Sequence, residues 1–222
     1  IWLAATGDEV VLPGMPIRSG QLYASNIATI DAWCRRYAMR TSVALVRDDQ
    51  TELSEAVANA VPEHDAIITS GGAWKGDCDF MSRALAGLGW EKVFHRIRLG
   101  PGKAAGFGIL QGKPVFILPG GPASNLVAFL ILVLPALLKL TGWSEPALPS
   151  AKAVLARSVS GQADWTQAIF GNLNSSDGSV HFDPFTNGNR LQALYQATAL
   201  LLIPEGVSHL PKGGVVAVSR LD

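Results

Sequence analysis

The sequence has few cysteines, few charged residues and no excess charge of either sign. Its 222 residues include two cysteines, Cys34 and Cys78, which form neither a metal-binding spacing nor a disulfide framework. A reduced, cytoplasmic setting is therefore expected. Lysine plus arginine and aspartate plus glutamate number 18 each, so the formal net charge is zero. This balance argues against charge-driven binding to nucleic acid or to a membrane surface.

Charged residues make up only 16% of the chain, and hydrophobic residues make up 48%. A chain of this length and composition can bury a sizeable core in one large or two small domains. The longest apolar run covers residues 126–138 and contains Pro135. It is shorter than the ~20 residues that a membrane span needs, so we expect a buried core helix.

The amino end shows no basic stretch followed by an apolar one, so no signal peptide is expected. The chain begins with Ile1 inside a strand-like run. This start indicates a fragment excised from a longer protein.

Strand-like and helix-like segments alternate as far as Gly142. Helical spacing of apolar residues after Ser25, an expected N-cap, predicts the first helix. The other predicted helices follow Asp49, begin at Asp79 and begin at Ala123. The expected strands are residues 2–6, 42–46, 66–68, 92–99, 106–110 and 114–118. The alternation predicts a three-layer, doubly wound α/β domain with a mostly parallel sheet over residues 1–143.

After Gly142 the pattern changes. Residues 144–150 form a proline-containing linker, which is typical of a boundary between domains. Short runs separated by polar turns follow at residues 151–159, 165–170, 191–202 and 215–221, and residues 187–189 read Asn-Gly-Asn, a tight-turn signal. They predict a small all-β domain over residues 150–222, a sandwich or a partial barrel.

Glycine-rich loops follow three of the predicted strands, at residues 6–9, 70–72 and 118–122. Ligands of doubly wound sheets bind beyond the carboxyl ends of the strands. In the middle loop, Gly71, Gly72 and Gly76 allow close backbone approach to an anion at the start of a helix. Asp77 and Asp79 beside it suit a metal-bridged phosphate. The alternative is an ordinary turn in which these aspartates cap the helix.

The ordered motifs resemble the molybdopterin molybdenumtransferase family, which includes MoeA and the gephyrin E domain. The motifs are Thr6-Gly-Asp-Glu-Val, Ser25-Asn, Val46-Arg-Asp-Asp, Thr69-Ser-Gly-Gly, Gly76-Asp-Cys-Asp-Phe, Pro101-Gly-Lys, Phe107-Gly and Leu118-Pro-Gly-Gly-Pro-Ala-Ser. The resemblance covers nearly all of the α/β part and, more weakly, the β-rich end from Ala197 to Leu221. It implies Mg²⁺-dependent insertion of molybdate into adenylated molybdopterin, with release of AMP.

The resemblance also implies roles for individual residues. Asp79, Asp49 and Glu9 are expected to be catalytic, and Asp77 and Asp79 to hold Mg²⁺. The expected substrate-binding residues are Gly71, Gly72, Lys75, Gly76, Lys103, Pro119, Gly120, Pro122 and Ser124. For Glu9 the alternative is a solvated loop acid, for Lys103 a surface lysine, and for Asp79 a helix N-cap.

The chain departs from the family pattern within the expected site. The usual Gly-Gly-Val-Ser-Val-Gly loop has Trp74 and Lys75 in place of its serine and second valine. The usual Pro-Gly-Asn-Pro loop has Gly121 in place of asparagine, and Ala104 replaces a proline. Family members also carry amino-terminal domains, and their site lies in the cleft of a homodimer.

Three functions fit these observations. The first is a molybdenum insertase, or the ligand-binding half of one, acting on small molecules. The second is a scaffold that binds a partner peptide in an exposed groove. The third is a related pterin- or nucleotide-binding module. The retained motifs at residues 76–79 and 118–122 favour the first function.

Overall fold

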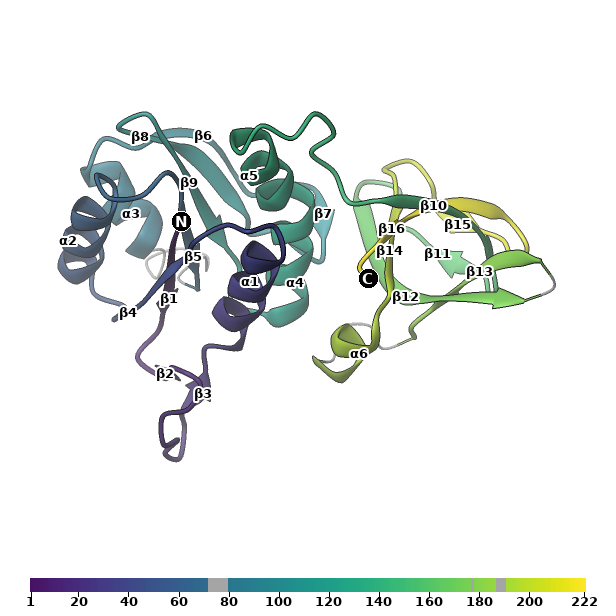
Figure 1. The fold of residues 1–222 in the computed structure, drawn as a ribbon, viewed down its shortest axis with the longest axis horizontal. Helices are drawn as coiled ribbons and strands as arrows, with labels where there is room; N and C mark the ends of the chain where they lie inside the picture. Colours follow the sequence, from purple (N-terminus) through teal and green to yellow (C-terminus); the bar gives the residue numbers. More distant parts are fainter. Residues whose placement is uncertain (72–79, 177, 187–190) are drawn as a thin grey trace. The chain divides into compact units, whose positions relative to one another are not determined.

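The computed structural model describes residues 1–71, 80–176, 178–186 and 191–222 (Figure 1). The described chain divides into two compact units. The first comprises Ile1–Ile97 and Gly102–Trp143, and the second comprises Arg98–Pro101 and Ser144–Asp222. The short segment Arg98–Pro101 thus groups with the second unit although it precedes the end of the first.

The first unit is built on a six-stranded sheet of order β4-β1-β5-β9-β8-β6. Strands β1, β4, β5 and β9 are mutually parallel, and β8 runs antiparallel to both of its neighbours. The bounds are β1 Trp2–Thr6, β4 Ser42–Val46, β5 Ile67–Ser70, β6 Glu91–His95, β8 Gly106–Leu110 and β9 Lys113–Leu118. The predicted mostly parallel sheet is confirmed.

Helices cover both faces of this sheet (Figure 1), so the three-layer architecture is confirmed. Helices α2 (Gln50–Ala60) and α3 (Phe80–Gly87) lie on one face, and α1 (Ser25–Arg36) packs with α4 (Pro122–Ala128) on the other. All five residues of β1 are buried, as expected of a central strand covered on both sides. The residue preceding α1 is Ala24, and no side chain caps the helix. The predicted Ser25 cap is therefore wrong, because Ser25 is already helical.

The apolar run lies in one continuous helix, Pro122–Leu140, which is long and apolar enough to cross a membrane by length and composition alone. Of its most apolar window, 61% is buried inside the unit, so it is the core helix that the sequence predicted. It consists of α4, a π-helical turn η2 (Phe129–Val133) and α5 (Leu134–Leu140). The wide turn precedes Pro135, which has no N–H to continue an α-helical ladder.

In the second unit, strands β13, β10, β16, β14 and β12 pair in that order, and β13 also pairs with β12. This last pairing closes the ring into a small barrel around Leu155, Phe182 and Leu201. The bounds are β10 Ser150–Leu155, β12 Thr166–Ser176, β13 Ser179–Pro184, β14 Ala199–Ile203 and β16 Val215–Arg220. Strand β7 (Leu99–Gly100) adds to the edge of β12, and β11 (Val159–Ser160) pairs with β15 (His209–Leu210).

In the second unit, the structure differs from two predictions made from the sequence. The run 191–202 was predicted as extended, but Leu191–Gln196 forms helix α6 and only Ala199–Ile203 forms a strand. The expected partial barrel is a closed one, because β12 is long enough to pair with β14 and β13 in succession. The tight turn predicted at residues 187–189 lies outside the described residues.

Candidate ligand-binding site

Four loops meet at one edge of the first unit's sheet, because the strands that precede them are parallel. They follow β1 at Gly7, β4 at Arg47, β5 at Gly71 and β9 at Pro119. The edge is thus the carboxyl edge of a doubly wound sheet, where ligands of this fold class bind. Three of the four loops are the glycine-rich loops that the sequence predicted to line a site.

The buried polar side chains of the described residues all lie at or near this edge. They are Thr6 at the end of β1, Thr69 and Ser70 at the end of β5, and Asn125 in the first turns of α4. Burying a polar group costs free energy unless it finds a partner. A fold that places its buried polar groups together therefore has a use for them at that place.

Ser70 is the centre of a hydrogen-bond network. Asn125 donates from Nδ2 to Ser70 Oγ (2.9 Å) and to the Pro119 carbonyl (2.9 Å). Asn26, on α1, donates from Nδ2 to Ser70 Oγ (3.2 Å) and to the Gly120 carbonyl (2.7 Å). A hydroxyl accepts two hydrogen bonds and donates one. Both acceptor positions of Ser70 are used by these amides, which leaves its proton available to a ligand.

Gly71 brings the backbone of β5 against the end of β1. Its φ of +107° lies in the left-handed region, and a Cβ there would lie 2.5 Å from the Thr6 carbonyl oxygen. Thr6 lies beside it and is 5% exposed. The hydroxyl of Thr6 has no hydrogen-bond partner among the described residues. Glycine at position 71 therefore leaves a polar, backbone-lined surface that a side chain would fill.

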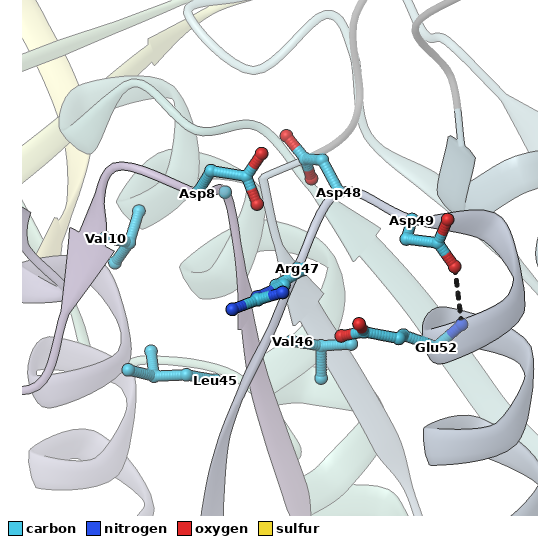
Figure 2. Close-up of a pocket in the computed structure, with 9 residues that line it drawn as sticks. Asp8, Val10, Leu45, Val46, Arg47, Asp48, Asp49 and Glu52 are labelled. Carbon is cyan, nitrogen blue, oxygen red and sulfur yellow. Dashed lines mark hydrogen bonds between the residues drawn. The ribbon is translucent and has the colours of Figure 1, made fainter.

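An open pocket of about 700 Å³ lies between the ends of β1 and β4. Its lining is strongly acidic, with Asp8, Asp48, Asp49 and Glu52 but one basic residue, Arg47. Figure 2 shows the carboxylates of Asp8 and Asp48 on the same side of this pocket. Neighbouring carboxylates repel one another, so an excess of acidic groups favours cations in the pocket.

The pKa of Asp48 is raised from its usual value of 3.8, chiefly by burial and then by the negative charges of Glu9 and Asp8. The nearby Thr6 hydroxyl opposes this rise, although its geometry does not meet that of a hydrogen bond. One carboxylate oxygen of Asp48 is buried without a hydrogen-bond partner among the described residues. Such an oxygen is suited to a hard cation.

Asp49 lines the same pocket and also caps a helix. Its Oδ1 accepts hydrogen bonds from the backbone N–H groups of Thr51 and Glu52, both at 2.9 Å, and so caps α2. Figure 2 shows the bond from Glu52. Asp48, its neighbour, is the residue near Glu9 and Asp8. Glu9 is exposed and its carboxylate folds back over Gly7. The catalytic roles of Asp49 and Glu9 stay predictions.

The remaining predicted site residues fall in the loop after β9, at Lys103 and outside the described residues. Pro119 is buried, Gly120 and Pro122 are exposed, and Ser124 is half-buried in the loop after β9 and the start of α4. Lys103 is exposed between β6 and β8, where its carbonyl accepts from the N–H of Ile97. Gly72, Trp74, Lys75, Gly76, Asp77 and Asp79 lie outside the described residues.

Within residues 1–71, 80–176, 178–186 and 191–222, no group of three or more His, Cys, Asp or Glu side chains is arranged to hold a metal ion. The described acids alone therefore do not form a complete protein cage. Mg²⁺ commonly binds through one or two carboxylates together with substrate phosphates and water. The pair Asp8 and Asp48 fits that kind of incomplete site.

Sequence reasoning did not assign roles to the residues that organise this edge. Asn26 was part of a recognised motif but had no function, and Ser70, Asn125, Thr6 and Asp48 were not proposed as site residues. An asparagine in an otherwise apolar helical run, as at position 125, is the one local signal that could have drawn attention. Their relationship becomes visible only when α1, β5 and α4 are brought together.

Comparison with known proteins identifies the family of this chain. Residues 2–139 match the family model described as "Probable molybdopterin binding domain". The chain therefore belongs to this class of molybdopterin-binding domains. It is, more particularly, a member of the MoeA, or molybdopterin molybdenumtransferase, family.

Three similar proteins are longer than this chain. A molybdopterin molybdenumtransferase of Haemophilus influenzae is 28% identical over 227 residues, covering 100% of this chain and 56% of the relative. Molybdopterin molybdenumtransferase 2 of Mycobacterium tuberculosis is 30% identical over 222 residues, covering 96% of this chain and 54% of the relative. The crystal structure of a molybdopterin biosynthesis MoeA protein from Pyrococcus horikosii superimposes with a TM-score of 0.84 at 29% identity, covering 100% of this chain and 54% of that one. The chain thus spans about half the length of these relatives.

Proposed function

We propose that this chain is the ligand-binding half of a molybdopterin molybdenumtransferase. It binds adenylated molybdopterin and molybdate at the carboxyl edge of the first unit's sheet, and the complete protein inserts the molybdenum and releases AMP. The observation that supports this most is the convergence of Thr6, Ser70, Gly71 and Asn125 at one edge, where buried polar groups meet a close backbone approach.

The two parts of the edge suit two parts of the substrate. The Ser70 hydroxyl and the loop Pro119–Gly121 offer hydrogen-bond donors to anionic oxygens. The acidic pocket around Asp48 offers a place for Mg²⁺, which supplies positive charge to the phosphate when bound. Asp8 and Asp48 would hold it with substrate oxygens, and Asp77 and Asp79, which lie outside the described residues, remain proposed ligands. Lys75, Lys103 and Ser124 remain proposed substrate contacts.

We further propose that the protein is a cytoplasmic homodimer. Residues 12–23 form an arm with internal hydrogen bonds, including one from the Tyr23 hydroxyl to the Met15 carbonyl at 3.1 Å. The arm is therefore ordered, yet Met15 is 57%, Ile17 48% and Leu22 62% exposed. Three exposed apolar side chains on one segment offer a surface that a partner can cover, and a second copy is the partner that the family implies.

Calorimetry with AMP in the presence of Mg²⁺, and separately with molybdate, tests the ligand-binding proposal. The Ser70→Ala variant removes the proposed donor, and Ser160→Ala makes the same chemical change at an exposed position of the second unit. We expect Ser70→Ala to lower the affinity for at least one of the two ligands about tenfold. Ser160→Ala should leave both affinities unchanged. Equal affinities in wild type and Ser70→Ala would contradict the proposed site.

A further inference from the structure

Asn125 stands out because it is buried and yet polar in an apolar helix. It is 2% exposed, and its two amide protons are used by Ser70 Oγ and the Pro119 carbonyl. Its own backbone N–H donates to the Gly121 carbonyl at 2.8 Å. Asn125 therefore contacts the loop after β9 through both side chain and backbone.

Two consecutive carbonyls of this loop are held by side-chain amides. Asn125 holds that of Pro119, and Asn26 holds that of Gly120. In a trans peptide unit the N–H points opposite to the C=O, and the peptide bonds of this loop are trans. When these carbonyls turn toward the two asparagines, the N–H groups of Gly120 and Gly121 must point the other way.

That other direction is the exposed side of the edge, since Gly120 and Gly121 are both exposed. Neither N–H donates to another group of the described residues. A Cβ on Gly120 would lie 3.8 Å from the Cα of Gly71, and a Cβ on Gly121 would lie 3.9 Å from Ser124 Oγ, so the loop lies close both to the end of β5 and to the first turn of α4. The result is a pair of free backbone donors on the exposed side of the loop, opposite the two asparagine side chains.

We propose that Asn125 is a positioning residue, which fixes the N–H groups of Gly120 and Gly121 as an anion cradle. The inference rests on the proposed function, because it assigns these donors to the anionic oxygens of the same ligands. The chain has glycine at 121, where the family pattern has an amide side chain. Asn125 lies four residues after position 121 in the sequence. Its buried amide contacts the same loop from the interior of the unit.

Two substitutions separate positioning from general stability. Asn125→Ala removes both side-chain donors, and Asn125→Asp keeps the shape but sets a carboxylate oxygen against the Pro119 carbonyl. Val127→Ala is the matched control, because Val127 is fully buried in the same helix and makes no polar side-chain contact. The probes are AMP with Mg²⁺ by calorimetry and the backbone ¹⁵N heteronuclear NOE of Gly120 and Gly121 in the free protein.

We expect both Asn125 variants to bind AMP at least about tenfold more weakly and to lower the NOE at Gly120 and Gly121. Val127→Ala should change neither. Unchanged affinity and NOE in Asn125→Ala would overturn the inference, while the effect of Ser70→Ala would still support the proposed function.

If Asn125→Ala does not fold, the half-buried Asn26→Ala variant releases the Gly120 carbonyl instead. An unaltered NOE at Gly121 together with unaltered affinity would then overturn the inference. If wild type binds neither AMP nor molybdate, the proposed function fails. The NOE measurement in the free protein then decides the positioning role by itself.

Discussion

Gly71 and Thr6 lie in direct backbone contact at the point where β5 and β1 end. A Cβ on Gly71 would lie 2.5 Å from the carbonyl oxygen of Thr6 and 2.7 Å from its hydroxyl oxygen. The N–H of Gly71 is bonded to the Leu118 carbonyl at 3.1 Å, so the residue cannot move away without breaking the contact with β9. Three strand ends are thus fixed by one glycine.

We predict that Gly71→Ala destabilises the first unit. The positive φ alone costs an alanine about 1–3 kcal/mol, and the contact with Thr6 adds to it. The control is Gly120→Ala, where the new Cβ meets no atom closer than 3.8 Å. Urea unfolding followed by tryptophan fluorescence measures both variants. Equal stabilities would show that the backbone at Gly71 is free to relax.

Because the pKa of Asp48 is raised, we predict that Asp48→Asn increases the stability of the folded protein by an amount that depends on pH. Since the folded-state pKa lies above the usual 3.8, the charged carboxylate destabilises the folded protein at neutral pH. The substitution should therefore increase the free energy of unfolding at pH 7. The gain should shrink as pH falls through the raised pKa and disappear below about 3.8, where Asp48 is protonated in both states. Urea titrations at pH 7, 5 and 3.5 measure it, and a loss of stability at pH 7 would contradict the assignment.

The order of strands and helices was predictable from the sequence because each element has its own local pattern. Alternation of apolar runs with helical spacing identified β1, α1, β4 and α2, and glycine-rich turns marked the strand ends. The carboxyl edge followed from parallel pairing alone. The resemblance then added the family and with it the expected chemistry.

The organisation of the site was not predictable in the same way. The Ser70 network joins residues separated by 44 and 55 positions in the chain, and no local pattern encodes such a contact. Asp48 and Asp49 are neighbours with different roles, because only the carboxylate of Asp49 reaches the N–H groups at the start of α2. Which of the two does so depends on the direction of the backbone at these residues, and the sequence does not give that direction. Helix α6 was missed because Leu191–Gln196 is a short apolar run that suits strand and helix equally.

Cys34 is predicted to be an unreactive thiol. Burial raises its pKa to about 11, so roughly one part in a thousand is thiolate at pH 8. In a Cys78→Ser background, a disulfide reagent should modify Cys34 at least about a hundredfold more slowly than free cysteine. Adding urea above the unfolding midpoint should abolish the difference. Rapid modification of the native protein would show that α1 opens readily.

The arm of residues 12–23 predicts a concentration-dependent dimer. Ile17→Glu should shift the protein toward monomer, because it places a charge among apolar side chains that a second copy would cover. Val215→Glu is the matched control, since Val215 is 69% exposed on the second unit. Sedimentation velocity over a range of concentrations measures the change. A wild-type protein that stays monomeric at high concentration would show that the arm has another partner or none.

Neighbouring aspartates offer the sharpest test of the metal site. Mg²⁺ that binds only the folded protein raises its stability, by about 2.7 kcal/mol at a hundredfold excess over the dissociation constant. If Asp48 helps to hold the ion, Asp48→Asn should remove most of the Mg²⁺-dependent rise in Tm. Asp49→Asn should retain it, because asparagine caps a helix as well as aspartate does.

The same pair separates the metal-binding role proposed for Asp48 from a metal-binding role of Asp49, for which the sequence predicts a catalytic function. Asp49 caps α2 with an oxygen that already accepts two N–H groups, whereas Asp48 has an oxygen without a partner among the described residues. Thermal unfolding of wild type and both variants, with Mg²⁺ and with Ca²⁺ as a larger ion, measures the response. If Asp49→Asn loses the Mg²⁺ response and Asp48→Asn keeps it, the metal ligand is Asp49, and the acidic pocket around Asp48 has a different role.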